Sequence, residues 1–153
     1  MSKAVPALFL AFVAVILSYA FAHRSGEPKP ATGVQIETTM IMSAAPVGTA
    51  RVAVGGRGRI FRQDDAKSPW VAVKSPTEAT LTRVHFLDGQ NGLIVGHDQV
   101  ILRTADGGKT WKQVFIDAAA ETPLFDVVQL DATRALAIGA YGLFLETVDG
   151  GTT

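Results

Sequence analysis

The chain has 153 residues, of which 48% are hydrophobic and 18% are charged, a balance typical of a globular protein of about one domain. Its 14 basic and 14 acidic side chains cancel, so no strong positive field exists to attract nucleic acid. It contains no cysteine, which excludes disulfide frameworks, thiolate metal sites and cysteine nucleophiles. Fifteen glycines and seven prolines favour many tight turns, as in all-β chains with short strands.

The N-terminal segment has the features of an export signal. Lys3 precedes an apolar stretch over residues 4–17, and an Ala-Phe-Ala sequence ends at Ala22, where a signal peptidase requires small residues. We expect residues 1–22 to form an apolar helix that is cleaved after Ala22. The alternative is an uncleaved anchor that contacts the membrane, because about 20 apolar residues cross the hydrocarbon core. Either way, residues 23–37 are predicted to be a linker, and the remainder is predicted to lie in the periplasm or its equivalent.

The rest of the chain contains a sequence repeat. When Gly55, Gly96 and Gly139 are aligned, an Asp follows each of them ten residues later. A Trp follows fifteen residues later in the first two copies, and the copies are 41 and 43 residues apart. A period of about 40 to 45 residues with short alternating strands and glycine-rich turns is typical of β-propeller blades, whereas helical repeats would show a 3.6-residue period.

Four strands can be read in the second copy, at residues 81–87, 93–95, 100–104 and 111–116. The turns between them contain glycines that we expect to supply positive φ, namely Gly89, Gly92, Gly107 and Gly108. The sequence therefore predicts an all-β fold, a partial β-propeller of four-stranded antiparallel blades within residues 38–153. The blades are expected at about 38–74, 81–116 and 124–153.

About two and a half blades are present, whereas about four to eight blades close a propeller. We therefore expect the sequence to be an N-terminal fragment of a longer protein. The third strand of the third copy, Leu143–Thr147, is then predicted to be an edge strand.

The second copy ends in Thr-Ala-Asp-Gly-Gly-Lys-Thr-Trp, which resembles the Asp-box motif S/T-x-D-x-G-x-T-W. The third copy matches this motif up to Thr153, and the first copy retains only Asp65 and Trp70. We expect a structural hairpin in which the carboxylate accepts backbone N–H groups, the glycines permit the turn and the indole anchors it. The residues concerned are Thr104, Asp106, Gly108, Thr110, Trp111, Asp149 and Gly151. The alternative roles for Asp106, a catalytic acid or a calcium ligand, are disfavoured because its own turn already engages the carboxylate.

The string from Gly96 to Trp111 and the D-x-x-x-G-L-I-V-G sequence that leads into it resemble the photosynthesis system II assembly factor family. The resemblance covers Met40 to Thr153. It implies a non-enzymatic exported scaffold without a cofactor, which binds a membrane or envelope protein. The family resemblance also implies that surface arginines dock the partner, so Arg57, Arg59 and Arg62 are candidate contacts. The alternative is that these arginines are solvated charges flanking strands.

The competing interpretation is a sialidase-like or other glycoside hydrolase, because Asp-boxes also occur in sialidases. Such a site requires three arginines, a Tyr/Glu nucleophile pair and an acidic Asp, and Tyr141 is the only tyrosine after the signal segment. Other glycoside hydrolases require two carboxylates close together, which the glutamates of this sequence do not indicate. His85 and His97 do not have the spacing of metal ligands. We therefore predict no catalytic residue, no metal site and no nucleic-acid partner.

Overall fold

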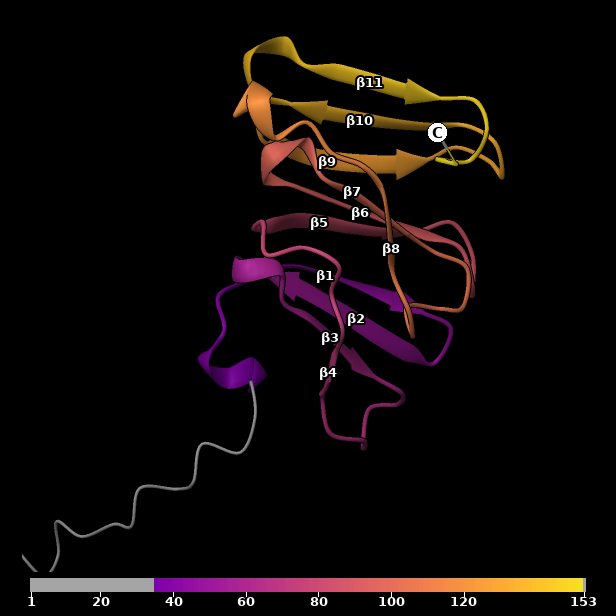
Figure 1. Ribbon diagram of the computed structural model, residues 1–153. Coiled ribbons are helices and arrows are strands. Elements are labelled where there is room, and N and C mark those ends of the chain that lie inside the picture. The colour runs from indigo at the N-terminus through magenta and orange to yellow at the C-terminus, as the bar shows by residue number, and fades with distance from the viewer. Residues whose placement is uncertain (1–34, 153) are drawn as a thin grey trace, which may run out of the picture. The chain divides into compact units, whose positions relative to one another are not determined.

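The computed structural model describes residues 35–152. The predicted export segment and most of the predicted linker lie outside these residues. After a single 3-10 turn, η1 (Ile36–Thr38), the chain forms three antiparallel sheets that follow one another along the sequence (Figure 1). The prediction of an all-β fold built from antiparallel blades is confirmed.

Each sheet is a meander in which consecutive strands are neighbours. Blade 1 consists of β1 (Ile41–Val47), β2 (Ala50–Gly55), β3 (Ile60–Gln63) and β4 (Val71–Val73). Blade 2 consists of β5 (Leu81–Phe86), β6 (Gly92–Gly96), β7 (Ile101–Thr104) and β8 (Lys112–Phe115). Blade 3 consists of β9 (Leu124–Gln129), β10 (Ala135–Gly139) and β11 (Phe144–Thr147). Within residues 35–152, β11 pairs only with β10 and is an edge strand, whereas β7 pairs with both β6 and β8.

The second and third strands of every blade are joined by an equivalent 3-10 turn. These turns are η2 (Gly56–Gly58), η3 (His97–Gln99) and η5 (Ala140–Gly142). Their central residues, Arg57, Asp98 and Tyr141, all adopt left-handed backbone conformations, with φ of 56°, 57° and 56°. A further turn, η4 (Ala118–Ala120), lies in the loop that leads from blade 2 to blade 3 and contacts η3.

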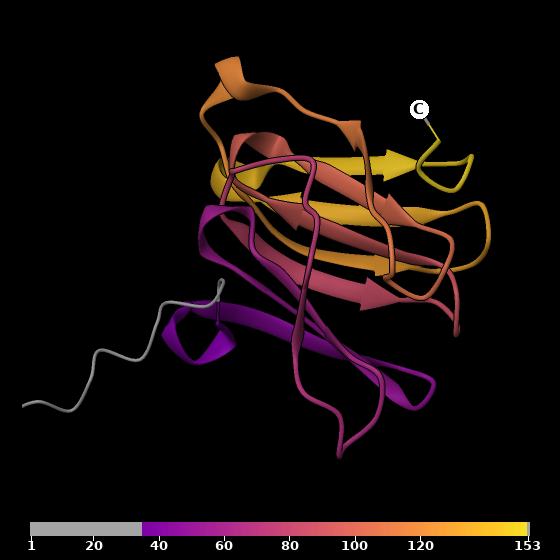
Figure 2. The ribbon, with the colours of Figure 1, turned by 60° about the horizontal axis from the view of Figure 1, so that its bottom comes forward.

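The three sheets stack face to face, and their first strands lie side by side, since β5 contacts both β1 and β9 (Figures 1 and 2). Alternate residues of β6 serve the two interfaces. Ile94 belongs to the apolar cluster shared with blade 1, while Leu93 and Val95 belong to the cluster shared with blade 3. This division follows from the two-residue period of a strand, which points successive side chains to opposite faces. Both faces of β6 are therefore buried, as expected of an inner strand in an internal propeller blade.

The aligned glycine of the repeat has a steric cause. Gly55, Gly96 and Gly139 have extended backbones that any residue can adopt. A Cβ atom at each would lie within 3.0 Å of a carbonyl oxygen just before the blade's first strand, that of Met40, Thr80 or Pro123. The same oxygens accept hydrogen bonds from Gly56, His97 and Ala140 at 2.9 to 3.0 Å. Glycine recurs there because this hydrogen bond draws two backbones together.

The expectation of positive φ holds for only two of the four turn glycines. Gly107 and Gly108 have φ of 71° and 81°, but Gly89 and Gly92 do not have positive φ. At Gly92 the requirement is space, because a Cβ would lie 2.6 Å from Cδ1 of Phe86. A Cβ at Gly89 would meet nothing within 4 Å, so neither packing nor φ requires glycine there.

Candidate functional site

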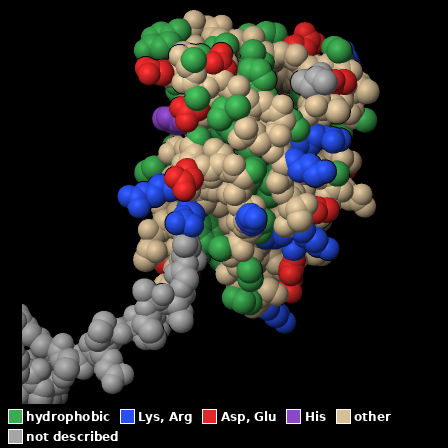
Figure 3. Space-filling view, viewed as in Figure 1, with side chains coloured by type: hydrophobic (Ala, Val, Ile, Leu, Met, Phe, Trp, Pro, Cys, Tyr) green, Lys and Arg blue, Asp and Glu red, His purple; other side chains and the backbone are tan. Residues whose placement is uncertain are grey.

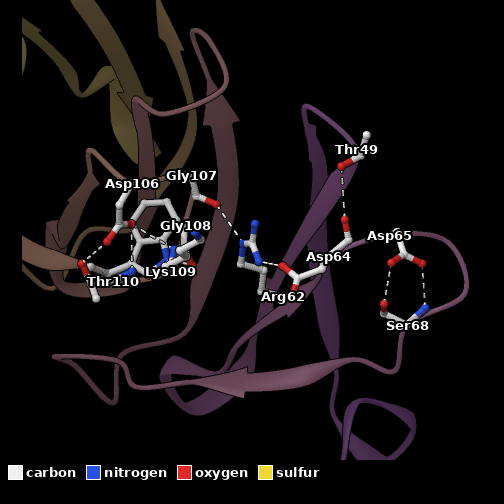
Figure 4. A network of polar contacts seen from close by, with 11 residues as sticks. Thr49, Arg62, Asp64, Asp65, Ser68, Asp106, Gly107, Gly108, Lys109 and Thr110 are labelled. Carbon is white, nitrogen blue, oxygen red and sulfur yellow. Dashed lines mark hydrogen bonds and ion pairs between the residues drawn. The ribbon is translucent and has the colours of Figure 1, made fainter.

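The Asp106 carboxylate organises the turn between β7 and β8 (Figure 4). Its Oδ1 accepts hydrogen bonds from Thr104 Oγ1 at 2.8 Å and from the backbone N–H groups of Lys109 and Thr110 at 3.0 and 2.9 Å. Its Oδ2 accepts a hydrogen bond from Thr110 Oγ1. Burial raises the pKa of Asp106, but these hydrogen bonds outweigh burial and bring the pKa down to about 2. The carboxylate is therefore ionised and fully engaged by its own turn at neutral pH.

Trp111 anchors this turn in the interface between blades 1 and 2. The side chain is 7% exposed, and its Nε1 donates a hydrogen bond to the carbonyl of Gly108 at 3.2 Å. The ring packs edge-on against Phe86, with 5.9 Å between the centroids. A Cβ on Gly108 would lie 2.7 Å from Cγ2 of Val52 in blade 1, so this glycine permits close contact between the blades as well as the turn.

The turn after β11 repeats part of this arrangement. Asp149 Oδ1 accepts hydrogen bonds from Thr147 Oγ1 at 2.7 Å and from the N–H of Thr152 at 3.0 Å. The N–H of Gly151 donates to Thr147 Oγ1 at 3.1 Å, the distance that also separates Gly108 N from Thr104 Oγ1. The third copy thus forms the same carboxylate-centred turn as the second copy.

The first copy forms a shorter carboxylate-centred turn, although its sequence no longer matches the Asp-box motif. Asp65 Oδ1 accepts hydrogen bonds from the N–H groups of Lys67 and Ser68 at 2.8 and 3.0 Å, and its Oδ2 accepts one from Ser68 Oγ at 2.7 Å. Ser68 therefore substitutes for the motif's threonine one residue earlier in the turn. The Ser68 hydroxyl, three residues after the aspartate, is the sequence signal for this turn. These hydrogen bonds, chiefly that from the Ser68 hydroxyl, hold the pKa of Asp65 below its usual value.

Each Asp-box carboxylate is held by hydrogen bonds within its own turn. These carboxylates lie in separate blades. Within residues 35–152, no three or more His, Asp or Glu side chains lie close enough together to hold a metal ion. None of the helices in this part of the chain has the length and apolar composition needed to cross a membrane.

The three candidate arginines lie in two different places. Arg57 and Arg59 are exposed at the η2 turn, and together with Lys74 and Glu78 they line a shallow hollow beside β4. Arg62 lies further along β3, and its side chain is only 16% exposed. In Figure 3 the Lys and Arg side chains of the face in view form several separate groups over blades 1 and 2, with Asp and Glu side chains between them. The structure therefore offers Arg57, Arg59 and Lys74 as one basic surface, which we call the η2 basic surface.

Arg62 is engaged within the molecule. Its Nε donates a hydrogen bond to the carbonyl of Gly107 in blade 2 at 3.1 Å, and its guanidinium forms an ion pair with Asp64 (Figure 4). The side chain thus joins blade 1 to the Asp-box turn of blade 2, which differs from the exposed docking role expected for it. The sequence carries no signal for this contact, because the acceptor is a backbone carbonyl 45 residues away.

Comparison with known proteins agrees with this architecture. The model of the family described as photosynthesis system II assembly factor YCF48 matches residues 62–153, which is more than half of the chain. Photosystem II assembly lipoprotein Ycf48 of Prochlorococcus marinus (strain NATL2A) is 45% identical over 56 residues, covering 37% of this chain and 17% of that protein. The protein of the same name from Synechococcus sp. (strain CC9902) is 32% identical over 88 residues, covering 56% of this chain and 26% of that protein.

The fold also matches a solved structure. The structure described as YCF48 bound to D1 peptide superposes with a TM-score of 0.67 at 23% sequence identity, covering 78% of this chain and 41% of that chain. At 23% identity, the similarity to this solved structure shows a shared fold alone. The chain therefore spans less than half of that solved chain and about a quarter or less of the two curated relatives.

Proposed function

Because the chain belongs to the photosynthesis system II assembly factor family, we propose that it is an exported scaffold that binds a peptide segment of a membrane or envelope protein. The family is one of assembly factors and not of enzymes. The solved relative, described as YCF48 bound to D1 peptide, supports a peptide as the bound partner.

The observation that carries the proposal is the η2 basic surface. Arg57 and Arg59 are exposed and line one hollow with Lys74, and Glu78 is the acidic side chain on its border. Two guanidinium groups on a turn can bind carboxylates through paired N–H donors, which favours a peptide with acidic side chains or a free C-terminus. Arg62 is not part of this surface, because the Gly107 carbonyl and Asp64 already engage it.

Export is part of the proposal because the two curated relatives described above are named lipoproteins. These 153 residues contain no cysteine, so they offer no cysteine for lipid attachment. We assign export, and any membrane attachment, to residues 1–22, which are followed by a linker at 23–37 and by the blades within 38–153.

The proposal is tested by fluorescence anisotropy with a labelled D1 peptide as the probe and the full chain as the receptor. Reversing both charges of the surface, Arg57→Glu with Arg59→Glu, should weaken binding at least ten-fold, and binding by the unmodified chain should weaken as salt increases. The matched control is Arg103→Glu with Lys112→Glu, which makes the same change in net charge on β7 and β8 of blade 2. Equal losses in the two double variants, or no binding by the unmodified chain, would contradict the proposal.

A further inference from the structure

A groove runs along the outer strand of blade 1, on the side toward blade 2. All three residues of β4 (Val71–Val73) line it, together with Lys74 and Arg62. Lys109, on the Asp-box turn of blade 2, lines it from the other blade. We call this hollow the β4 groove. Blades 1 and 2 each contain four strands, so the groove lies between two complete blades.

The β4 groove is continuous with the η2 basic surface. Ala72, Val73 and Lys74 line both the groove and the hollow that Arg57 and Arg59 border. Lys74 is exposed, so its charge is available to a ligand in either hollow. A ligand bound to Arg57 and Arg59 can therefore continue along β4 while it stays on the surface of blade 1.

Basic side chains outnumber acidic ones along the two hollows. The basic side chains are Arg57, Arg59, Arg62, Lys74 and Lys109. The acidic ones are Glu78 and Asp64, and Asp64 is already neutralised by its ion pair with Arg62 (Figure 4). The whole chain has equal numbers of basic and acidic groups, so this excess of positive charge is local. Charge complementarity therefore favours an acidic ligand.

The outer edge of β4 supplies backbone hydrogen-bonding groups. Among residues 35–152, β4 pairs with β3 and with no other strand. Such an edge presents N–H and C=O groups to which an extended peptide can add as a further strand. Because β4 is the fourth strand of a complete blade, this edge lies on the outer rim of the fold.

Val71 makes this edge apolar. It is 59% exposed, and it pairs across the sheet with Arg62, whose side chain reaches blade 2. Residues directly opposite in a sheet share a face, so Val71 also lies on the face toward blade 2. Through the 41-residue period Val71 corresponds to Lys112 of β8, and an exposed lysine is a residue that protects an edge strand from pairing. Blade 1 thus presents an apolar side chain where blade 2 presents a charge.

We propose that the β4 groove binds the continuation of the peptide held by the η2 basic surface, as an extended strand paired with β4. This inference rests on the proposed function and specifies its partner. The paired segment has an acidic residue at each end, one for Arg57 and Arg59 and the other for Lys109. An apolar residue between them packs on Val71. Backbone pairing supplies affinity, and the alternating side chains supply selectivity.

The direct test uses the full chain and the peptide Glu-Val-Thr-Val-Glu, labelled with fluorescein at its N-terminus, in fluorescence anisotropy. The peptide should bind, and its affinity should fall as salt increases. Two variant peptides have the same charges. One is methylated at the backbone nitrogens of both valines, and the other at those of the threonine and the last glutamate. Only one of these two sets of nitrogens can face β4, so one variant should bind at least ten-fold more weakly than the other. Equal affinities of the two methylated peptides would overturn the proposal.

A matched pair of variants locates the binding in the groove. Lys109→Glu reverses the charge at the far end of the groove and should weaken binding of the unmethylated peptide by about three-fold or more. Lys112→Glu makes the same charge change on β8, at a residue that does not line the groove, and should leave binding nearly unchanged. Equal effects of the two variants would overturn the proposal.

The double variant Arg57→Glu with Arg59→Glu separates this inference from the proposed function. It should weaken binding of the same peptide, as Lys109→Glu does. If the double variant weakens binding and Lys109→Glu does not, the η2 basic surface is supported and its continuation along β4 is overturned. If the unmodified chain binds the acidic strand at β4 but not the D1 peptide, the β4 groove is supported and the proposed function is overturned.

Discussion

The Nε atom of Arg62 lies 3.1 Å from the carbonyl oxygen of Gly107, so a side chain of blade 1 binds the backbone of the Asp-box turn in blade 2. The N–H of the same glycine donates to the carbonyl of Gln90 in the neighbouring turn of blade 2, at 2.9 Å. Gly107 thus connects β3 of blade 1, the Asp-box turn and the turn between β5 and β6. The left-handed conformation of Gly107 at the tip of the turn presents both of its polar groups to these partners.

Removing the Arg62 side chain should therefore destabilise the fold. We expect Arg62→Ala to lower the free energy of unfolding by about 1.5 to 3 kcal/mol, the usual range for a hydrogen bond made by a charged group. Arg59→Ala, which removes an exposed arginine close by on the same blade, should change it by less than about 0.5 kcal/mol. Urea unfolding monitored by circular dichroism measures both values. Equal effects would show that the contact with Gly107 contributes nothing.

The indole of Trp111 should contribute more than any other part of the Asp-box. We expect Trp111→Ala to cost on the order of 3 to 5 kcal/mol, because it leaves a cavity in the interface with blade 1 and removes the contact with Phe86. Lys109→Ala removes only an exposed side chain and leaves the N–H that Asp106 accepts, so it should cost under about 0.5 kcal/mol. Urea unfolding measures the loss of stability in both variants. Equal losses in Trp111→Ala and Lys109→Ala would contradict the anchoring role of the indole.

The repeat made the fold class predictable, because the spacing of Gly55, Gly96 and Gly139 is regular and the residues around them alternate as strands do. The reason for these glycines was not predictable, because each is required by a carbonyl oxygen about 16 residues earlier in the chain and not by its own φ. The contact of Arg62 with the Gly107 carbonyl was not predictable for a related reason. A sequence shows the charge of a side chain but not the backbone carbonyl that it binds.

The steric role of the repeat glycine can be tested with a matched pair in blade 2. Gly96→Ala should destabilise the fold by more than about 2 kcal/mol, because a Cβ there would overlap the Thr80 carbonyl, which cannot move without breaking its hydrogen bond from His97. Gly89→Ala should be neutral or stabilising by up to about 1 kcal/mol, because its Cβ would meet open space and alanine restricts the unfolded chain. Thermal unfolding of the two variants gives the comparison. A Gly96→Ala variant as stable as Gly89→Ala would refute the steric argument.

The lowered pKa of Asp106 makes the stability of the fold depend on pH. Its carboxyl has a pKa of about 2 in the folded chain, compared with an ordinary value of 3.8, because the hydrogen bonds of the turn favour the ionised form more than burial disfavours it. A group whose folded pKa is depressed contributes its full stabilisation above its unfolded pKa and loses it as the pH falls through its folded pKa. The contribution of Asp106 is therefore complete above about pH 4 and is lost on acidification toward pH 2.

Replacing Asp106 by Asn isolates this contribution. Asp65, Asp88 and Asp131 also have lowered pKa values, so the unmodified chain loses stability from several carboxylates in acid. The difference in the free energy of unfolding between the unmodified chain and Asp106→Asn cancels those shared contributions and leaves that of Asp106. We expect the difference to be constant between about pH 5 and 7, to decrease below pH 4, and to be smallest near pH 2, as measured by urea unfolding at each pH. A difference that does not change between pH 5 and 2 would mean that the ionised carboxylate does not hold the turn.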